Sequence, residues 1–280
     1  DLAHVVWAVN LGCLGFHVWP FRAADPEHCD ELRLDLDPQP GTGFDDIRRA
    51  AKELKALLDE LGVAGYPKTT GNRGLHVYVR LQPRWDSYEV RSAAVAVARE
   101  LERRRPDILT AAWWKEERGE RVFVDYNQNA RDRTVASAYS VRPTPDARVS
   151  CPITWDEVPD VEPRELRLDT VPDRLRTFGD PAADIDEHAG RLDALHALAD
   201  RDEAGGLGDA PWPPHFARQR GEPKRVQPSR DRDRPRATQR GRAGDPQPGG
   251  PPDPQHRRPP TPGRRSAPRT GQGDEDEFED

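Results

Sequence analysis

The sequence predicts an α+β fold, in which mixed β-sheets are flanked by helices and followed by a disordered tail. Over roughly the first 200 residues, segments with apolar side chains at every second position alternate with segments at helical spacing. Near residue 221 the chain becomes rich in proline and glycine, and aliphatic residues almost vanish. We therefore expect a globular domain over residues 1–220 and a tail over residues 221–280.

The elements of the globular part follow in order from these two periodicities. Residues 31–37 alternate polar and apolar side chains, as in a strand with one buried face. Residues 44–61 carry apolar side chains at helical spacing, and residues 87–105 form a second amphipathic helix that Pro106 ends. Further strands are expected at residues 66–70, 75–81, 121–126 and 135–141, the first two joined by a glycine turn.

Composition and charge exclude several classes of protein. Of 280 residues only 34% are apolar and 29 are proline, and the formal net charge is −7. No run approaches the roughly 18 apolar residues of a membrane span, and no basic segment opens a signal peptide, so we expect a cytoplasmic protein without a membrane partner. Three scattered cysteines predict reduced thiols. The absence of methionine indicates a fragment or an incomplete gene model.

Two aspartates of the first strand are candidate metal ligands. Asp35 and Asp37 lie two residues apart, so both side chains leave the same face of the strand while Leu34 and Leu36 pack on the other. Two carboxylates about 6 to 7 Å apart can hold one divalent ion or two. A strand end whose exposed face is acidic is the alternative, and this short pattern taken alone favours it.

Asp125 changes that balance. It lies in the run Val122 to Tyr126, which is typical of a protein core. An unpaired carboxylate is costly there unless a cation compensates it. A third metal ligand is the economical explanation, and an ion pair with Arg131 or Arg133 is the alternative.

The glycine turn between two expected strands is a candidate phosphate site. The segment Thr69 to His76 combines exposed backbone N–H groups with a hydroxyl, a guanidinium and an imidazole. It is followed by a strand rather than a helix, which excludes a Walker A loop or a Rossmann fingerprint. A tight hairpin with polar surface residues is the alternative.

Four motifs follow one another along the chain: Leu34 to Pro38, Thr70 to His76, Val124 to Tyr126 followed by Asn129, Arg131 and Thr134, and Tyr139 to Pro143. In this order, the motifs resemble the polymerase domain of bacterial DNA ligase D, a member of the archaeo-eukaryotic primase superfamily. The closing segments, Gly205 to Pro214 and Gly221 to Arg230, resemble those of stand-alone actinobacterial members, so the resemblance covers about Asp1 to Arg230.

The resemblance implies a primase-polymerase catalytic domain with an assigned site. Asp35, Asp37 and Asp125 match the carboxylates that bind two Mg²⁺ or Mn²⁺ ions and align the primer 3′-hydroxyl with the α-phosphate of a nucleotide. The residues matching those that lie at the nucleotide in the family are His17, Thr70, Arg73, His76 and Arg142. For His17, a packed position between Phe16 and Trp19 is the alternative.

The expected function is therefore a DNA-directed nucleotidyltransferase that adds NTP or dNTP to primer ends in end joining or gap repair. The implied partners are a DNA primer-template or broken ends, the nucleotide, and end-joining proteins such as Ku or a separate ligase. Family domains have a region before the position of Trp7 that grips the 5′-phosphate, so the N-terminal part of the family domain is missing from this sequence. No KxDG motif is present, so no ligase activity is expected.

The tail supports the rival hypothesis, a truncated and non-catalytic scaffold that binds nucleic acid. Lys224 to Thr270 contains 13 basic residues against 4 acidic ones, whereas Asp274 to Asp280 is almost wholly acidic. The basic block can hold phosphates by counterion release, or the acidic end can compete for it. An inert solvated tail is the alternative.

Overall fold

A five-stranded mixed sheet organises the part of the chain that the structure, a computed structural model, describes, residues 1–225. The strand order is β3-β4-β2-β6-β5; β5 and β6 run parallel, and the other neighbours are antiparallel. Two short strands, β1 and β7, pair separately. The predicted α+β class is confirmed. The predicted tail lies outside the described residues, apart from its first five.

The strands and helices have these bounds. The strands are β1 His17–Val18, β2 Cys29–Pro38, β3 Tyr66–Thr69, β4 Leu75–Trp85, β5 Leu109–Thr110, β6 Val122–Asp125 and β7 Val135–Ala136. The α-helices are α1 Leu2–Asn10, α2 Phe44–Glu60, α3 Ser87–Arg104, α4 Lys115–Arg118, α5 Val171–Phe178 and α6 Asp193–Ala204, and the 3-10 helices are η1 Tyr126–Asn129 and η2 Ile185–His188. No helix within residues 1–225 is long and apolar enough to cross a membrane.

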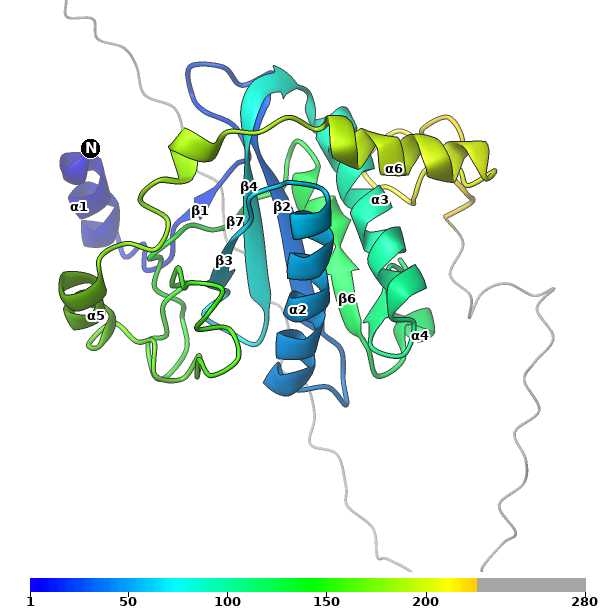
Figure 1. The fold of residues 1–280 in the computed structure, drawn as a ribbon. Helices are drawn as coiled ribbons and strands as arrows, with labels where there is room; N and C mark the ends of the chain where they lie inside the picture. Colours follow the sequence, from blue (N-terminus) through cyan, green and yellow to red (C-terminus); the bar gives the residue numbers. More distant parts are fainter. Residues whose placement is uncertain (226–280) are drawn as a thin grey trace, which may run out of the picture. The chain divides into compact units, whose positions relative to one another are not determined.

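Strand β2 separates the core from the polar face of the sheet. Its alternate residues Leu32, Leu34 and Leu36 are fully buried in the main hydrophobic cluster. Figure 1 shows α2 and α3 lying over one face of the sheet, and both helices contribute side chains to that cluster. Because side chains alternate along a strand, Asp35 and Asp37 are directed to the opposite face. The helices thus position the carboxylates by covering the other side.

The prediction of a strand over residues 135–141 is wrong beyond Ala136, where β7 ends. The backbone of Tyr139 has a φ of 61°, which is incompatible with an extended strand. The N–H groups that would form a ladder are instead bonded to two separate segments, Ser137 to the carbonyl of Phe16 at 3.0 Å and Tyr139 to that of Ser150 at 2.7 Å. This segment therefore joins the β1 region to the segment around Ser150.

The described C-terminal segment packs on α3. Trp212 is buried, and its backbone N–H donates to the Glu222 carboxylate at 2.9 Å. Glu222 is itself only 2% exposed and also accepts from the N–H of Gln219 at 2.9 Å. Glu222, which the sequence predicted to lie in the tail, thus takes part in these contacts.

Candidate active site

The three aspartates predicted as metal ligands lie on two neighbouring strands. In the β2–β6 ladder Asp35 is directly opposite Asp125, and Asp37 is opposite Phe123. Directly opposed residues of antiparallel strands project from the same face, with Cβ atoms about 5 Å apart. Asp37 shares this face because it lies two residues along β2. The register therefore groups three carboxylates on the face opposite α2 and α3.

The three carboxylates have no lysine or arginine as a direct ion-pair partner within residues 1–225, although the charges of Lys68 and Arg118 act on Asp35 and Asp125. Burial raises the pKa of Asp35 well above its ordinary value, and the charges of Asp125 and Asp37 raise it further. Burial likewise raises the pKa of Asp125. Within residues 1–225 no lysine or arginine forms an ion pair with these aspartates; their polar contacts include Gln39 to Asp37 at 3.1 Å and Gln128 to Asp125 at 2.9 Å. At Asp35, burial and the repulsion between carboxylates thus outweigh the attraction of the nearby cation.

The salt-bridge alternative for Asp125 is not observed. Arg131 pairs with Glu27 at 2.6 Å on the surface. Arg133 lines the same cavity as Asp125 without forming an ion pair with it among the described residues, and its Nε atom is buried with no hydrogen-bond partner there. Neither arginine neutralises the carboxylate.

The donor set suits a divalent ion, although its side chains are not gathered around one point. Carboxylate oxygens are the ligands that Mg²⁺ and Mn²⁺ prefer, and the repulsion felt by Asp35 would be relieved by a cation. Within residues 1–225, however, no group of three His, Cys, Asp or Glu side chains is already close enough together to hold a metal ion. Metal binding would therefore require the side chains around the opposed residues Asp35 and Asp125 to rearrange.

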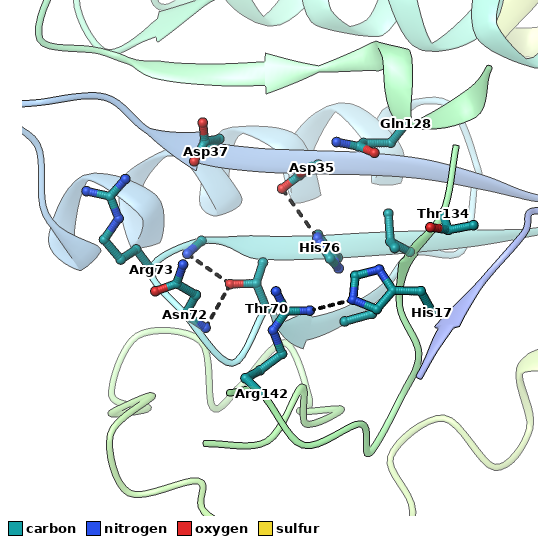
Figure 2. Close-up of a pocket in the computed structure, with 13 residues that line it drawn as sticks. His17, Asp35, Asp37, Thr70, Asn72, Arg73, His76, Gln128, Thr134 and Arg142 are labelled. Atoms are coloured by element: carbon teal, nitrogen blue, oxygen red, sulfur yellow. Dashed lines mark hydrogen bonds and ion pairs between the residues drawn. The ribbon is translucent and has the colours of Figure 1, made fainter. Parts of the chain in front are cut away.

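A cavity of about 220 Å³ opens beside the carboxylates. Figure 2 shows its walls, with Asp35 and Asp37 along one side and the cationic groups on the other. Of the eight predicted site residues it collects seven, namely His17, Asp35, Asp37, Thr70, Arg73, His76 and Arg142. Asp125 instead lines a second cavity of about 270 Å³, which shares Asp37 and Gln128 with the first. The predicted residues thus surround two adjoining spaces.

The turn between β3 and β4 brings its polar groups close to Arg142. Gly71 has a φ of +68°, and a Cβ atom there would collide with Cγ of Arg142. A Cβ at Gly74 would collide with the carbonyl oxygen of Leu36. The hydroxyl of Thr70 accepts from the N–H groups of Asn72 at 3.1 Å and Gly74 at 3.2 Å, which closes the turn. The hairpin alternative is therefore correct as geometry, and the same hairpin lines the cavity.

Arg142 and His17 contact each other in the wall of that cavity, as Figure 2 shows. Nη1 of Arg142 donates to Nε2 of His17 at 3.1 Å, and Nε of Arg142 is buried without a hydrogen-bond partner among residues 1–225. Burial and the charge of Arg142 lower the pKa of His17, which favours the neutral imidazole. His17 is exposed rather than packed between Phe16 and Trp19. The unpaired donor of Arg142 is suited to an anionic ligand.

Sequence reasoning missed Lys68, Gln128 and Ser150. Lys68 is 2% exposed, and its Nζ lies 2.8 Å from Nδ1 of His76 and 2.5 Å from Oγ of Ser150. Burial lowers the pKa of Lys68 to about 7. The only signal in the sequence was a lysine in a strand two residues before the turn, whereas Ser150 lies 82 residues away along the chain. Gln128 could have been suspected from its position three residues after Asp125.

Comparisons with known proteins agree on one family. The model of the LigD primase-polymerase domain matches residues 1–182. The multifunctional non-homologous end joining protein LigD of Mycolicibacterium smegmatis is 36% identical over 193 residues, which are 68% of this chain and 25% of that protein. The bifunctional non-homologous end joining protein LigD of Bacillus subtilis is 33% identical over 187 residues, 66% of this chain and 30% of that protein.

A solved structure agrees with these sequence matches. The polymerase domain of Mycobacterium tuberculosis ligase D in complex with DNA superposes with a TM-score of 0.61 at 30% identity, covering 66% of this chain and 68% of that one. The chain spans about a quarter to a third of the length of the two curated relatives.

Proposed function

Because the chain belongs to the family of LigD primase-polymerase domains, as its sequence motifs predicted, we propose that it is a nucleotidyltransferase that extends DNA primer ends. The observation that carries the proposal is the pairing of Asp35 with Asp125 beside a cavity walled by Arg73 and Arg142. Within residues 1–225, carboxylates without a direct lysine or arginine partner stand next to two arginines that form no ion pair with a carboxylate. Nucleotide transfer requires this combination, because metal ions and a triphosphate together neutralise both sets of groups.

Asp35, Asp37 and Asp125 are the residues that would hold the divalent ions, Mg²⁺ or Mn²⁺. When bound, such ions activate the attacking hydroxyl and stabilise charge on the transferring phosphoryl group. The protein itself fixes two of these carboxylates by strand register and the third by the alternation along β2. It also holds Asp37 and Asp125 through the amide groups of Gln39 and Gln128.

The cationic wall would bind the phosphates of NTP or dNTP. Arg142 has a buried Nε without a partner among the described residues, and Arg73 stands exposed on the turn. Thr70 shapes the turn through its hydroxyl, and His76 and His17 line the same cavity. Bidentate guanidinium contacts favour a triphosphate over a monophosphate because they need several phosphate oxygens.

The second cavity suits the primer end. It begins at Asp37 and Asp125, on the side of the carboxylates away from the turn, and Lys115, Arg118 and Arg133 lie in its wall. Cationic side chains at this point can hold backbone phosphates while leaving a 3′-hydroxyl near the carboxylates. The relative from M. tuberculosis was solved with DNA, which supports DNA as the partner. Ku and a separate ligase remain partners proposed from the end-joining context of the relatives.

Primer extension tests this function. With Mg²⁺ or Mn²⁺, the full chain should add nucleotides to a short primer, and Asp35→Asn or Asp37→Asn should slow addition by about 10²- to 10³-fold or more. The asparagines keep shape and remove the mutual repulsion, so folding should be retained. Asp45→Asn, at a side chain that is 87% exposed, is the matched control. Extension that is independent of metal, or unaffected by both substitutions, contradicts the proposal; DNA binding without any extension favours a non-catalytic scaffold.

A further inference from the structure

The buried amine of Lys68 lies directly behind His76. Lys68 belongs to β3, opposite His76 of β4 in the ladder, and its side chain is 2% exposed. Its Nζ contacts Nδ1 of His76 at 2.8 Å and Oγ of Ser150 at 2.5 Å, and it lies 5.1 Å from the ring centre of Tyr78. None of these partners is a carboxylate. The direct contacts of the amine are therefore neutral, and the cost of burial outweighs the attraction of Asp35 and Glu31, which form no ion pair with it among residues 1–225.

The direction of these hydrogen bonds follows from Ser150. Its hydroxyl donates to the carbonyl oxygen of Thr69 at 3.0 Å, so its oxygen is left to accept from Lys68. The protonated amine carries three N–H groups and no lone pair, so it can only donate, and a second N–H is available for Nδ1 of His76. Nδ1 then accepts, and the imidazole proton resides on Nε2.

The other side of the ring selects the same tautomer. Nε2 of His76 lies 3.5 Å from Oδ1 of Asp35 and faces the cavity, as Figure 2 shows. When Asp35 is ionised, a bare nitrogen lone pair there would be directed at a carboxylate oxygen, which is unfavourable, whereas an N–H group would be attracted to it. Groups on both sides of the imidazole thus agree.

We propose that Lys68, itself oriented by Ser150, is a positioning residue that holds His76 as the Nε2–H tautomer and directs this proton toward Asp35 and the nucleotide cavity. The consequence for catalysis rests on the proposed function. A neutral histidine locked this way is a hydrogen-bond donor at a fixed point between the carboxylates and the phosphates. An imidazole with the opposite tautomer would present a lone pair to two anionic groups and would oppose nucleotide binding.

The tautomer can be observed without any assay of activity. Two-dimensional ¹H–¹⁵N spectra of the imidazole groups, with the His76 signals identified by their loss in His76→Gln, distinguish a protonated from an unprotonated ring nitrogen. In the wild-type protein at neutral pH, we expect Nε2 to carry the proton and Nδ1 to be bare. A proton on Nδ1 overturns the proposal, whether or not the protein extends primers. This measurement therefore distinguishes a failure of the tautomer proposal from a failure of the proposed function.

Two substitutions test the role of the amine. Lys68→Met keeps an unbranched side chain without donors and should allow both tautomers of His76. Lys55→Met, at a half-buried lysine of α2 that is paired with Asp59, should leave the spectrum unchanged. In primer extension Lys68→Met should raise KM for the nucleotide about ten-fold, the scale of one lost hydrogen bond in a charged site. Unchanged His76 signals and a KM equal to that of Lys55→Met overturn the proposal.

Ser150→Ala provides the second variant if Lys68→Met does not fold. It removes one acceptor of the amine and leaves the donor to His76 in place. We expect the Nε2–H tautomer to persist in part and KM to rise about three-fold, less than in Lys68→Met, because one of two anchors of the amine remains. A His76 spectrum and a KM identical to those of the wild-type protein would contradict the orienting role of Ser150.

Discussion

Two buried cations, Lys68 and Arg91, differ in how their charge is accommodated. Arg91 on α3 is fully buried; it pairs with Asp209 at 2.9 Å and stacks over Trp212 with its guanidinium carbon 4.0 Å from the ring centre. It also donates to Asn127 Oδ1 at 2.8 Å and to the carbonyl oxygens of Ala210 and Pro211. Lys68 has neutral hydrogen-bond partners only, His76 and Ser150, and lies behind the cavity.

The difference separates a structural cation from a functional one. A guanidinium whose donors are satisfied by a carboxylate, an amide and two carbonyls ties the C-terminal segment to η1, which directly follows Asp125. An amine without a carboxylate contributes little to stability, so its burial is better explained by what it does to His76. Burial lowers the pKa of both groups, but only the lysine is brought near neutrality.

The largest expected effect is on folding, at the structural cation. Arg91→Met leaves Asp209 without its cation and two carbonyl groups without the donor that Arg91 supplies, so the free energy of unfolding should fall by about 3 to 5 kcal/mol. Urea denaturation followed by tryptophan fluorescence measures this loss. Arg84→Met, at an exposed arginine of β4, is the control and should change stability by less than about 0.5 kcal/mol. Similar losses for both variants would remove the distinction drawn for Arg91.

The second prediction concerns nucleotide affinity at the cationic wall. Arg142→Ala should weaken triphosphate binding about ten- to a hundred-fold, because a partly buried guanidinium with an unpaired donor loses a charge-assisted contact. Arg73→Ala should weaken it only about three-fold, because this side chain is exposed and its charge is screened. Titration calorimetry with NTP or dNTP gives both values. Affinities as tight as that of Arg84→Ala in both variants would show that the phosphates bind elsewhere.

The elements that could be predicted from sequence are those set by local patterns. The alternation of Leu34 and Leu36 with Asp35 and Asp37 was sufficient to place the carboxylates on one polar face. The spacing of apolar residues gave α2 and α3 to within one or two residues of their ends. The family motif also indicated which aspartate of a later strand belongs with them.

The parts that could not be predicted depend on contacts between distant segments. Nothing in residues 66–69 indicates that Lys68 is buried, because Ser150, which covers it, belongs to a segment without regular structure. Strands β2 and β6, which are distant in sequence, likewise pair with each other, and only the resemblance suggested this pairing. The strand expected after Ala136 failed for the same reason, since the hydrogen bonds of that segment go to Phe16 and Ser150.

The smallest expected effect is on the pH dependence of the free energy of unfolding, which should differ between Lys68 and Arg91. Lys68 has a pKa of about 7 in the folded protein against an ordinary value of 10.5, so between these pH values the unfolded chain binds one proton more. Stability linked to Lys68 is therefore complete above pH 10.5 and is lost as the pH falls toward 7. From pH 8 to pH 9 this linkage should raise the free energy of unfolding by about 1 kcal/mol in the wild-type protein relative to Lys68→Met. Arg91 remains charged throughout, so the difference between the wild-type protein and Arg91→Met should stay constant over the same range. Urea denaturation at the two pH values measures both differences, and a constant difference for Lys68→Met as well would mean that its amine is as fully charged in the fold as the guanidinium of Arg91.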